Sequence, residues 1–137
     1  MGNLTDLADR YVALWNEPDP DARRAAVGAL WATDGCHVLQ PPQEVVKTAT
    51  DLGLTTTFEA HGHDQLTERV RLAYEAFVAP GEFTFRRRED VARLRDVLKF
   101  SWEMVATSSG DVAAVGTEVL VLDAGDLIQT DYQFIEP

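Results

Sequence analysis

The chain has 137 residues, of which 45% are hydrophobic and 26% are charged, and its formal net charge is −11. This length and composition predict one globular domain with a single core, spanning residues 1–137. The strong negative charge argues against binding nucleic acid or an anionic membrane through a general electrostatic field.

The cellular setting is indicated by what the sequence lacks. Cys36 is the single cysteine, so no disulfide can form within the chain. No apolar run approaches the length of a transmembrane helix, and the first residues lack the basic and apolar regions of a secretory signal. These features predict a cytoplasmic protein in a reducing compartment.

Two helices are expected at the start of the chain. Apolar residues recur at helical spacing across residues 4–15, and Asn3 can cap that first helix. Asp19 is a good cap for a second helix, and Pro20 suits its first position. We expect Gly35 to supply the left-handed residue that ends this helix.

The middle of the chain mixes helices with one short strand. Residues 36–40 are expected to form a strand, which two prolines stop. A short helix is expected over 43–52, followed by a loop over 54–62. Residues 64–78 carry a stronger helical pattern.

The remainder of the chain is expected to be β. Long strands are predicted over 83–94, 97–106, 112–122 and 127–135, and the last two are joined by a hairpin turn. Helices first and an antiparallel meander last is the pattern of an α+β fold.

Both ends of the chain, taken together, resemble the nuclear transport factor 2-like superfamily, and in particular its bacterial SnoaL-like branch. The resemblance rests on the two capped helices with their hinge over 11–35, on the turn at 62–64 and on the hairpin over 116–135. It implies a cone-shaped fold in which N-terminal helices pack on a strongly curved antiparallel sheet and enclose a pocket. It also implies a homodimer formed through the sheet, and residues 43–62 are a candidate lid at the pocket mouth.

The same resemblance implies cofactor-free acid/base chemistry, such as double-bond isomerisation, aldol cyclisation or dehydration. These reactions rest on one or two acids, or a His–Asp pair, inside an apolar cone. A carboxyl group desolvated in such a cavity has a raised pKa and can exchange a proton near neutral pH. No phosphate-binding glycine loop is present, and the spacing of His61 and His63 does not suit zinc, so we expect neither a cofactor nor a metal.

Three residues are the candidate catalytic groups. Ketosteroid isomerases of the superfamily carry a basic aspartate just before a proline at the end of the first strand, where this chain has Gln40. Their oxyanion-side aspartate falls near Glu118, which interrupts an apolar strand and either faces the pocket or has a structural role. His37 alternates with Leu39 and can face the cavity floor, and Tyr132 is a candidate pocket hydroxyl. The expected substrate-binding residues are Tyr11, Trp15, Trp31, Gln40, Tyr74, Phe85, Trp102 and Phe134.

Two kinds of function remain open at this stage. The first is an enzyme of cyclase, isomerase or dehydratase type, acting on a small apolar metabolite that contains a ring. The second is a non-catalytic ligand-binding or dimerisation module of the same fold, which the glutamine at position 40 favours. Eight of the twelve basic residues lie between 69 and 99, where they form either a solvated strand face or a site for an anionic ligand or partner.

Overall fold

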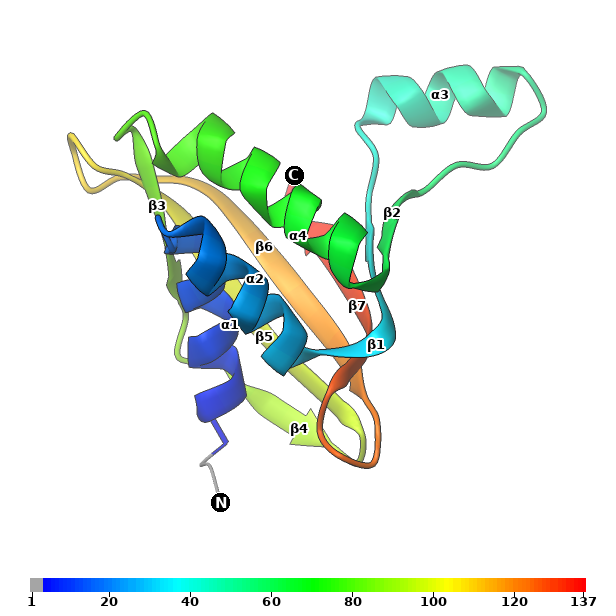
Figure 1. Ribbon diagram of the computed structural model, residues 1–137. Coiled ribbons are helices and arrows are strands. Elements are labelled where there is room, and N and C mark those ends of the chain that lie inside the picture. The colour runs from blue at the N-terminus through cyan, green and yellow to red at the C-terminus, as the bar shows by residue number, and fades with distance from the viewer. Residues whose placement is uncertain (1–3) are drawn as a thin grey trace.

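Residues 4–137 are described by a computed structural model of the chain (Figure 1), so the helix cap expected at Asn3 lies outside the described residues. Helices α1 (Asp6–Asn16) and α2 (Pro20–Leu30) form where the apolar spacing predicts them. The Asp19 side chain accepts a hydrogen bond from the Asp21 backbone N–H at 3.2 Å, and Pro20 begins α2. The capping chemistry at this hinge therefore agrees with the sequence.

Gly35 has a different role from the one expected. Strand β1 (Trp31–Leu39) begins directly after α2, and Gly35 lies inside this strand, at a break in its register with β7 (Ile128–Ile135). A Cβ at Gly35 would come within 2.7 Å of the Ile128 carbonyl oxygen. The prediction of a left-handed helix end was wrong, because glycine is needed here for the close approach of two strands.

The segment after β1 leaves the body of the protein. Helix α3 (Gln43–Asp51) forms as expected, but none of its residues is buried, and Figure 1 shows it standing away from the other helices. The expected loop over 54–62 contains a short strand, β2 (Phe58–His61), which pairs antiparallel with β1. Helix α4 (Gly62–Ala73) follows at once and continues as a π-helical turn, η1 (Tyr74–Val78).

The strands form one curved sheet. The expected strand over 83–94 is interrupted, giving β3 (Phe83–Arg87) and β4 (Ala92–Leu94), and β5 (Val97–Ala106) and β6 (Val112–Leu122) complete the set. Across residues 4–137 the seven strands run in the order β2-β1-β7-β6-β5-β3, with β4 beside β5. The pairing of β1 with β7 is parallel and the other pairings are antiparallel. The α+β fold is therefore confirmed, with one parallel pair in an open sheet.

The core lies between the helices and the inner face of this sheet. Its large members from the helices include Tyr11 and Leu14 of α1 and Leu66 of α4, and Phe100 and Leu120 come from the sheet. Each is at most 2% exposed, so the helices close one side of the sheet against water. Of the helices in residues 4–137, none combines the length and apolar character needed to span a bilayer.

Candidate active site

A cavity of about 250 Å³ lies inside the cone, between α1, α4 and the inner face of the sheet. Four of the expected wall residues line it: Tyr11, Trp15, Phe85 and Trp102. The other lining residues are mostly apolar, and the polar exceptions are Arg69 and Gln133. The cavity can therefore take a small apolar molecule and offers it few polar contacts.

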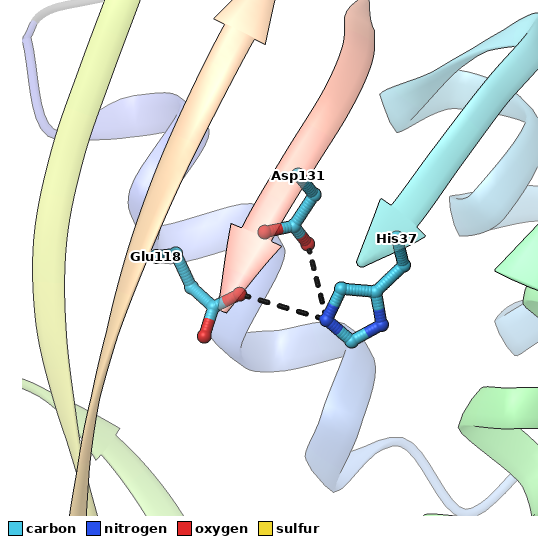
Figure 2. A group of neighbouring side chains, drawn as sticks. All are labelled: His37, Glu118 and Asp131. Atoms are coloured by element: carbon cyan, nitrogen blue, oxygen red, sulfur yellow. Dashed lines mark ion pairs between the residues drawn. The ribbon is translucent and has the colours of Figure 1, made fainter. Parts of the chain in front are cut away.

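A cluster of three ionisable side chains lies beneath this cavity. His37 comes from β1, Glu118 from β6 and Asp131 from β7, and all three are completely buried. His37 pairs with Asp131 across the sheet, and Asp131 pairs with Leu120, two residues from Glu118. Figure 2 shows both carboxylates turned toward the His37 Nε2 atom, at 3.8 Å for Glu118 and 3.6 Å for Asp131.

The Tyr11 hydroxyl lies against both carboxyl groups. Its oxygen is 2.8 Å from Glu118 Oε1 and 2.5 Å from Asp131 Oδ2. A phenol has one hydrogen to donate, so it can satisfy only one of these two contacts as a donor. The other contact then requires a proton on the carboxyl group, and the geometry therefore indicates that one of the two acids is neutral.

The pKa values of the two acids are shifted in opposite directions. Burial raises the pKa of Asp131 well above its ordinary value, and the negative charge of Glu118 raises it further. Burial also acts to raise the pKa of Glu118, but hydrogen bonds with His37, Asp131 and Trp102 outweigh it and lower that pKa. Burial and the two acids raise the pKa of Tyr11. A proton held within the pair therefore favours Asp131, and the opposite shifts favour an ionised Glu118 and an intact phenol.

Three cavity residues connect the buried cluster to the space above it. Tyr11 is one of them. Trp102 donates its indole N–H to Glu118 Oε2 at 2.6 Å, and Gln133 Oε1 lies 3.1 Å from His37 Nε2. Because His37, Glu118 and Asp131 are absent from the cavity wall, a ligand would meet the cluster through these three side chains.

The same cluster was tested for its fit to a metal ion. Among the described residues, His37, Glu118 and Asp131 offer donor atoms that all lie within 4.8 Å of one another. One imidazole and two carboxylates are suitable ligands for a divalent cation. The Tyr11 hydroxyl, however, already joins both carboxylates at hydrogen-bond distance. This arrangement suits a shared proton better than a cation.

Several residues predicted for the site lie elsewhere. Trp31 is buried in the core, with its ring centre 5.7 Å from that of Tyr11. The ring of Tyr74 stacks under the Arg23 guanidinium, at 4.7 Å. Gln40 is exposed and accepts a hydrogen bond from the Ile135 backbone N–H at 2.8 Å, which extends the strand pairing outside the cavity.

The orientation expected for β7 is corrected by the structure. Tyr132 and Phe134 are 43% and 49% exposed and lie on the outer face of the sheet. Asp131 and Gln133 face inward instead, because side chains alternate along a strand and the pairing of β7 with β1 sets the register. The tyrosine that lines the cavity is therefore Tyr11, and sequence reasoning missed Asp131 as the partner of its hydroxyl.

The structure also corrects the expectation that residues 43–62 form a lid. No residue of the segment 43–61 lines the cavity, and α3 extends away from it (Figure 1). The cavity wall opposite the sheet is formed by α1 and α4 together with Phe77. Sequence reasoning also missed Arg69 of α4, although an arginine on the apolar side of an amphipathic helix is a signal that could have indicated it.

Comparison with solved structures identifies the class of fold. A candidate isomerase of the SnoaL-like family from Agrobacterium tumefaciens shares 24% identity, with a TM-score of 0.76 over 96% of this chain and 95% of that one. A SnoaL-like protein of unknown function from Burkholderia thailandensis matches at 13% identity, with a TM-score of 0.66 over 98% and 95% of the two chains. An NTF2-like protein of unknown function from Exiguobacterium matches at 18% identity, with a TM-score of 0.63 over 95% and 98%.

These likenesses show that the chain has the NTF2-like fold in the form found in SnoaL-like proteins. Neither a protein-family model nor a curated protein matches the sequence. The fold is therefore established by structure, and the function has to be argued from the cavity and its buried cluster.

Proposed function

We propose that this protein is a cofactor-independent acid/base enzyme that acts on a small, apolar, ring-containing molecule in the cavity. The observation that supports this proposal is Tyr11, which lines the cavity and whose hydroxyl contacts both Asp131 and Glu118. The reaction belongs to the isomerase, cyclase or dehydratase type, since each of these moves a proton without an electron acceptor.

Tyr11 acts as a relay in both directions. In the accepting direction, a C–H bond next to a ligand carbonyl breaks and leaves its electron pair as an enolate. Its proton passes to the Tyr11 oxygen while the hydroxyl proton moves to Glu118. In the donating direction, Tyr11 gives a proton to the enolate and takes one from Asp131. The proton on Glu118 then returns to Asp131 through the Tyr11 oxygen, which contacts both acids, and the starting state is restored. The raised pKa of Tyr11 means that the phenol stays intact between these steps.

Trp102 and His37 have supporting roles in this mechanism. The indole N–H of Trp102 stabilises the ionised form of Glu118, because a hydrogen bond donated to a carboxylate favours its charge. His37 lies within 4 Å of both carboxylates and is oriented by Gln133. These contacts favour one protonated and one ionised acid, and a proton relay needs one acid in each state.

The experiment uses a cyclic ketone as a probe, because proton transfer can be followed without knowing the natural substrate. The protein is incubated with 2-tetralone in D₂O, and NMR measures the exchange of hydrogens next to the carbonyl. We expect wild type to exceed buffer, and Tyr11→Phe and Asp131→Asn each to lose about 10²-fold or more of this rate.

Tyr132→Phe is the matched control, since it removes the same hydroxyl from the outer face of the sheet. Its rate should equal that of wild type. If Tyr11→Phe keeps the full rate, the relay is wrong. If wild type binds 2-tetralone without accelerating exchange, the protein is a binding module and not an enzyme.

The outer face of the sheet supports a second proposal, namely association with a second copy of the chain. Tyr132 and Phe134 are exposed there, and Val119 of β6 pairs directly with Tyr132. An exposed apolar face of this kind is typical of an interface. Light scattering should give the mass of a dimer for wild type and of a monomer for Tyr132→Lys. A monomeric wild type at micromolar concentration would contradict this association.

A further inference from the structure

Arg69 is a cation in the cavity wall that has neither a hydrogen-bond nor an ion-pair partner in the described part of the chain. It comes from α4, it lines the cavity, and its buried Nε atom makes no hydrogen bond. No carboxylate of residues 4–137 forms an ion pair with its guanidinium, on which Glu118 and Asp131 act only through longer-range attraction. A guanidinium has five N–H donors, so this group has donors available to a ligand.

The stacking of Arg69 fixes where its charge lies. Its Cζ atom is 5.3 Å from the centre of the Trp15 ring, and Trp15 also lines the cavity. A guanidinium on an aromatic face is held in one plane while its N–H edge stays open. The open edge is suited to an acceptor with two oxygens in that plane, which is the geometry of a carboxylate.

The rest of the cavity limits what such a ligand can be. Its wall away from Arg69 is apolar, with Phe85, Met104 and Ala114 among the lining residues. The volume of about 250 Å³ lies below the range of roughly 300–1,000 Å³ that holds drug-sized ligands. A molecule with one or two rings fits this space, and a larger polycyclic body does not.

We propose that the cavity selects small apolar carboxylic acids, with Arg69 binding the carboxylate and the apolar walls holding the ring. This inference rests on the proposed function, because it names the class of molecule that the same cavity takes. Arg69 acts as a specificity residue, and the ring of a ligand bound to it lies toward Tyr11, which shares the cavity wall.

The experiment compares two probes that differ in one substituent, which is a charged carboxylate in the first and a neutral amide in the second. Calorimetry at pH 7 measures the affinity of the protein for 2-naphthoate and for 2-naphthamide, which share one ring system. We expect wild type to bind the carboxylate roughly tenfold more tightly or better, since a charge-assisted hydrogen bond is worth about 1.5–3 kcal/mol. Arg69→Met should lose this preference while still binding the amide, and Arg69→Lys should keep part of it.

Arg71→Met is the matched control. Arg71 lies on the same helix, but it faces solvent and pairs with Glu68 and Glu75. This variant should keep the full preference for the carboxylate. Equal affinity of wild type for the two probes, or a preference that survives in Arg69→Met, would overturn the inference. If the carboxylate preference is found but 2-tetralone exchange is absent, the inference stands and the proposed enzyme activity fails.

Discussion

Glu103 and Glu118 lie on neighbouring strands of one sheet, and their surroundings differ in most physical respects. Glu103 on β5 faces outward and pairs with Arg86 at 2.6 Å and with Arg88 at 3.0 Å. Glu118 on β6 faces inward, where Asp131 is its nearest acidic neighbour. The outer acid has cations to hold its charge, and hydrogen bonds from Arg86 and Arg88 lower its pKa. Among residues 4–137, no arginine or lysine forms an ion pair with the inner acids, and the Tyr11 hydroxyl joins them instead.

The comparison explains the uneven charge of the sequence. The basic residues of β3 and β4 pair with nearby acids, as Arg87 does with Asp9 and Arg93 with Asp126. They therefore form a solvated strand face of ion pairs, which contribute little stability individually. Arg69 differs from these paired residues, because it lines the cavity.

The largest expected effect comes from removing the proton acceptor. Glu118→Gln keeps the shape of the side chain, but an amide cannot take a proton from Tyr11. The exchange of 2-tetralone hydrogens should fall by about 10²-fold or more, as measured by NMR. Glu103→Gln makes the same chemical change on the outer face and should leave the rate unchanged. Equal rates for the two variants would contradict the distinction between the faces.

A smaller effect is expected from crowding the Trp102 ring. Gly116 of β6 lies directly opposite Trp102, and a methyl group there would overlap the ring. Gly116→Ala must therefore displace the indole from Glu118, and we expect the free energy of unfolding to fall by about 1–3 kcal/mol in a denaturant titration. Gly28→Ala is the control, because a Cβ at Gly28 meets nothing within 4 Å, and it should stabilise α2 by about 0.5–1 kcal/mol. A neutral Gly116→Ala would show that the ring is free to move.

The smallest effect is a change in how stability depends on pH. Folding raises the pKa of Asp131, so between its unfolded and folded pKa values the folded state holds a proton that the unfolded state lacks. Stability from this group is fully present below about pH 3.9, the ordinary value, and declines as pH rises toward the folded pKa. Asp131→Asn should remove this decline. Its melting temperature should therefore increase relative to that of wild type as the pH rises above 4.

Asp126, on the surface, should show the opposite dependence of stability on pH. A hydrogen bond from Arg93 lowers the pKa of Asp126, so its contribution is present above the unfolded pKa and is lost as pH falls through the folded pKa. Asp126→Asn should therefore have a lower melting temperature than wild type at neutral pH, and the same melting temperature in acid.

The prediction for Asp131 has its own contrary outcome. Parallel melting curves for wild type and Asp131→Asn at all pH values would contradict a neutral Asp131.

The fold was predictable because its signals are local. The cap at Asp19 and the apolar spacing of α1 depend on neighbouring residues, and they formed as expected. The role of Gly35 was not predictable in this way, because it depends on how closely a second strand approaches. Strand β2 was not predictable either, because it lacks an alternating apolar pattern and is defined by its pairing with β1.

The candidate site also has residues that local pattern could predict and residues that it could not. Glu118 and His37 stood out as polar residues within apolar strands, and the structure brings them together. The choice between Asp131 and Tyr132 depended on the register of β7, and a shift of one residue exchanges the two faces. Tyr11 was expected as a wall and not as a proton relay, because its acidic partners lie more than a hundred positions away along the chain.

Helix α3 has a practical consequence for work on this protein. It has nine residues, none of them buried, and β1 and β2 join it to the body through their paired ends at Leu39 and Phe58. A helix this short is marginal without tertiary packing, so the excursion is the natural place for a protease to cut the native chain. The same excursion can carry a fluorescent label or a purification tag, or be replaced by a short turn, while the cavity is left intact for measurement.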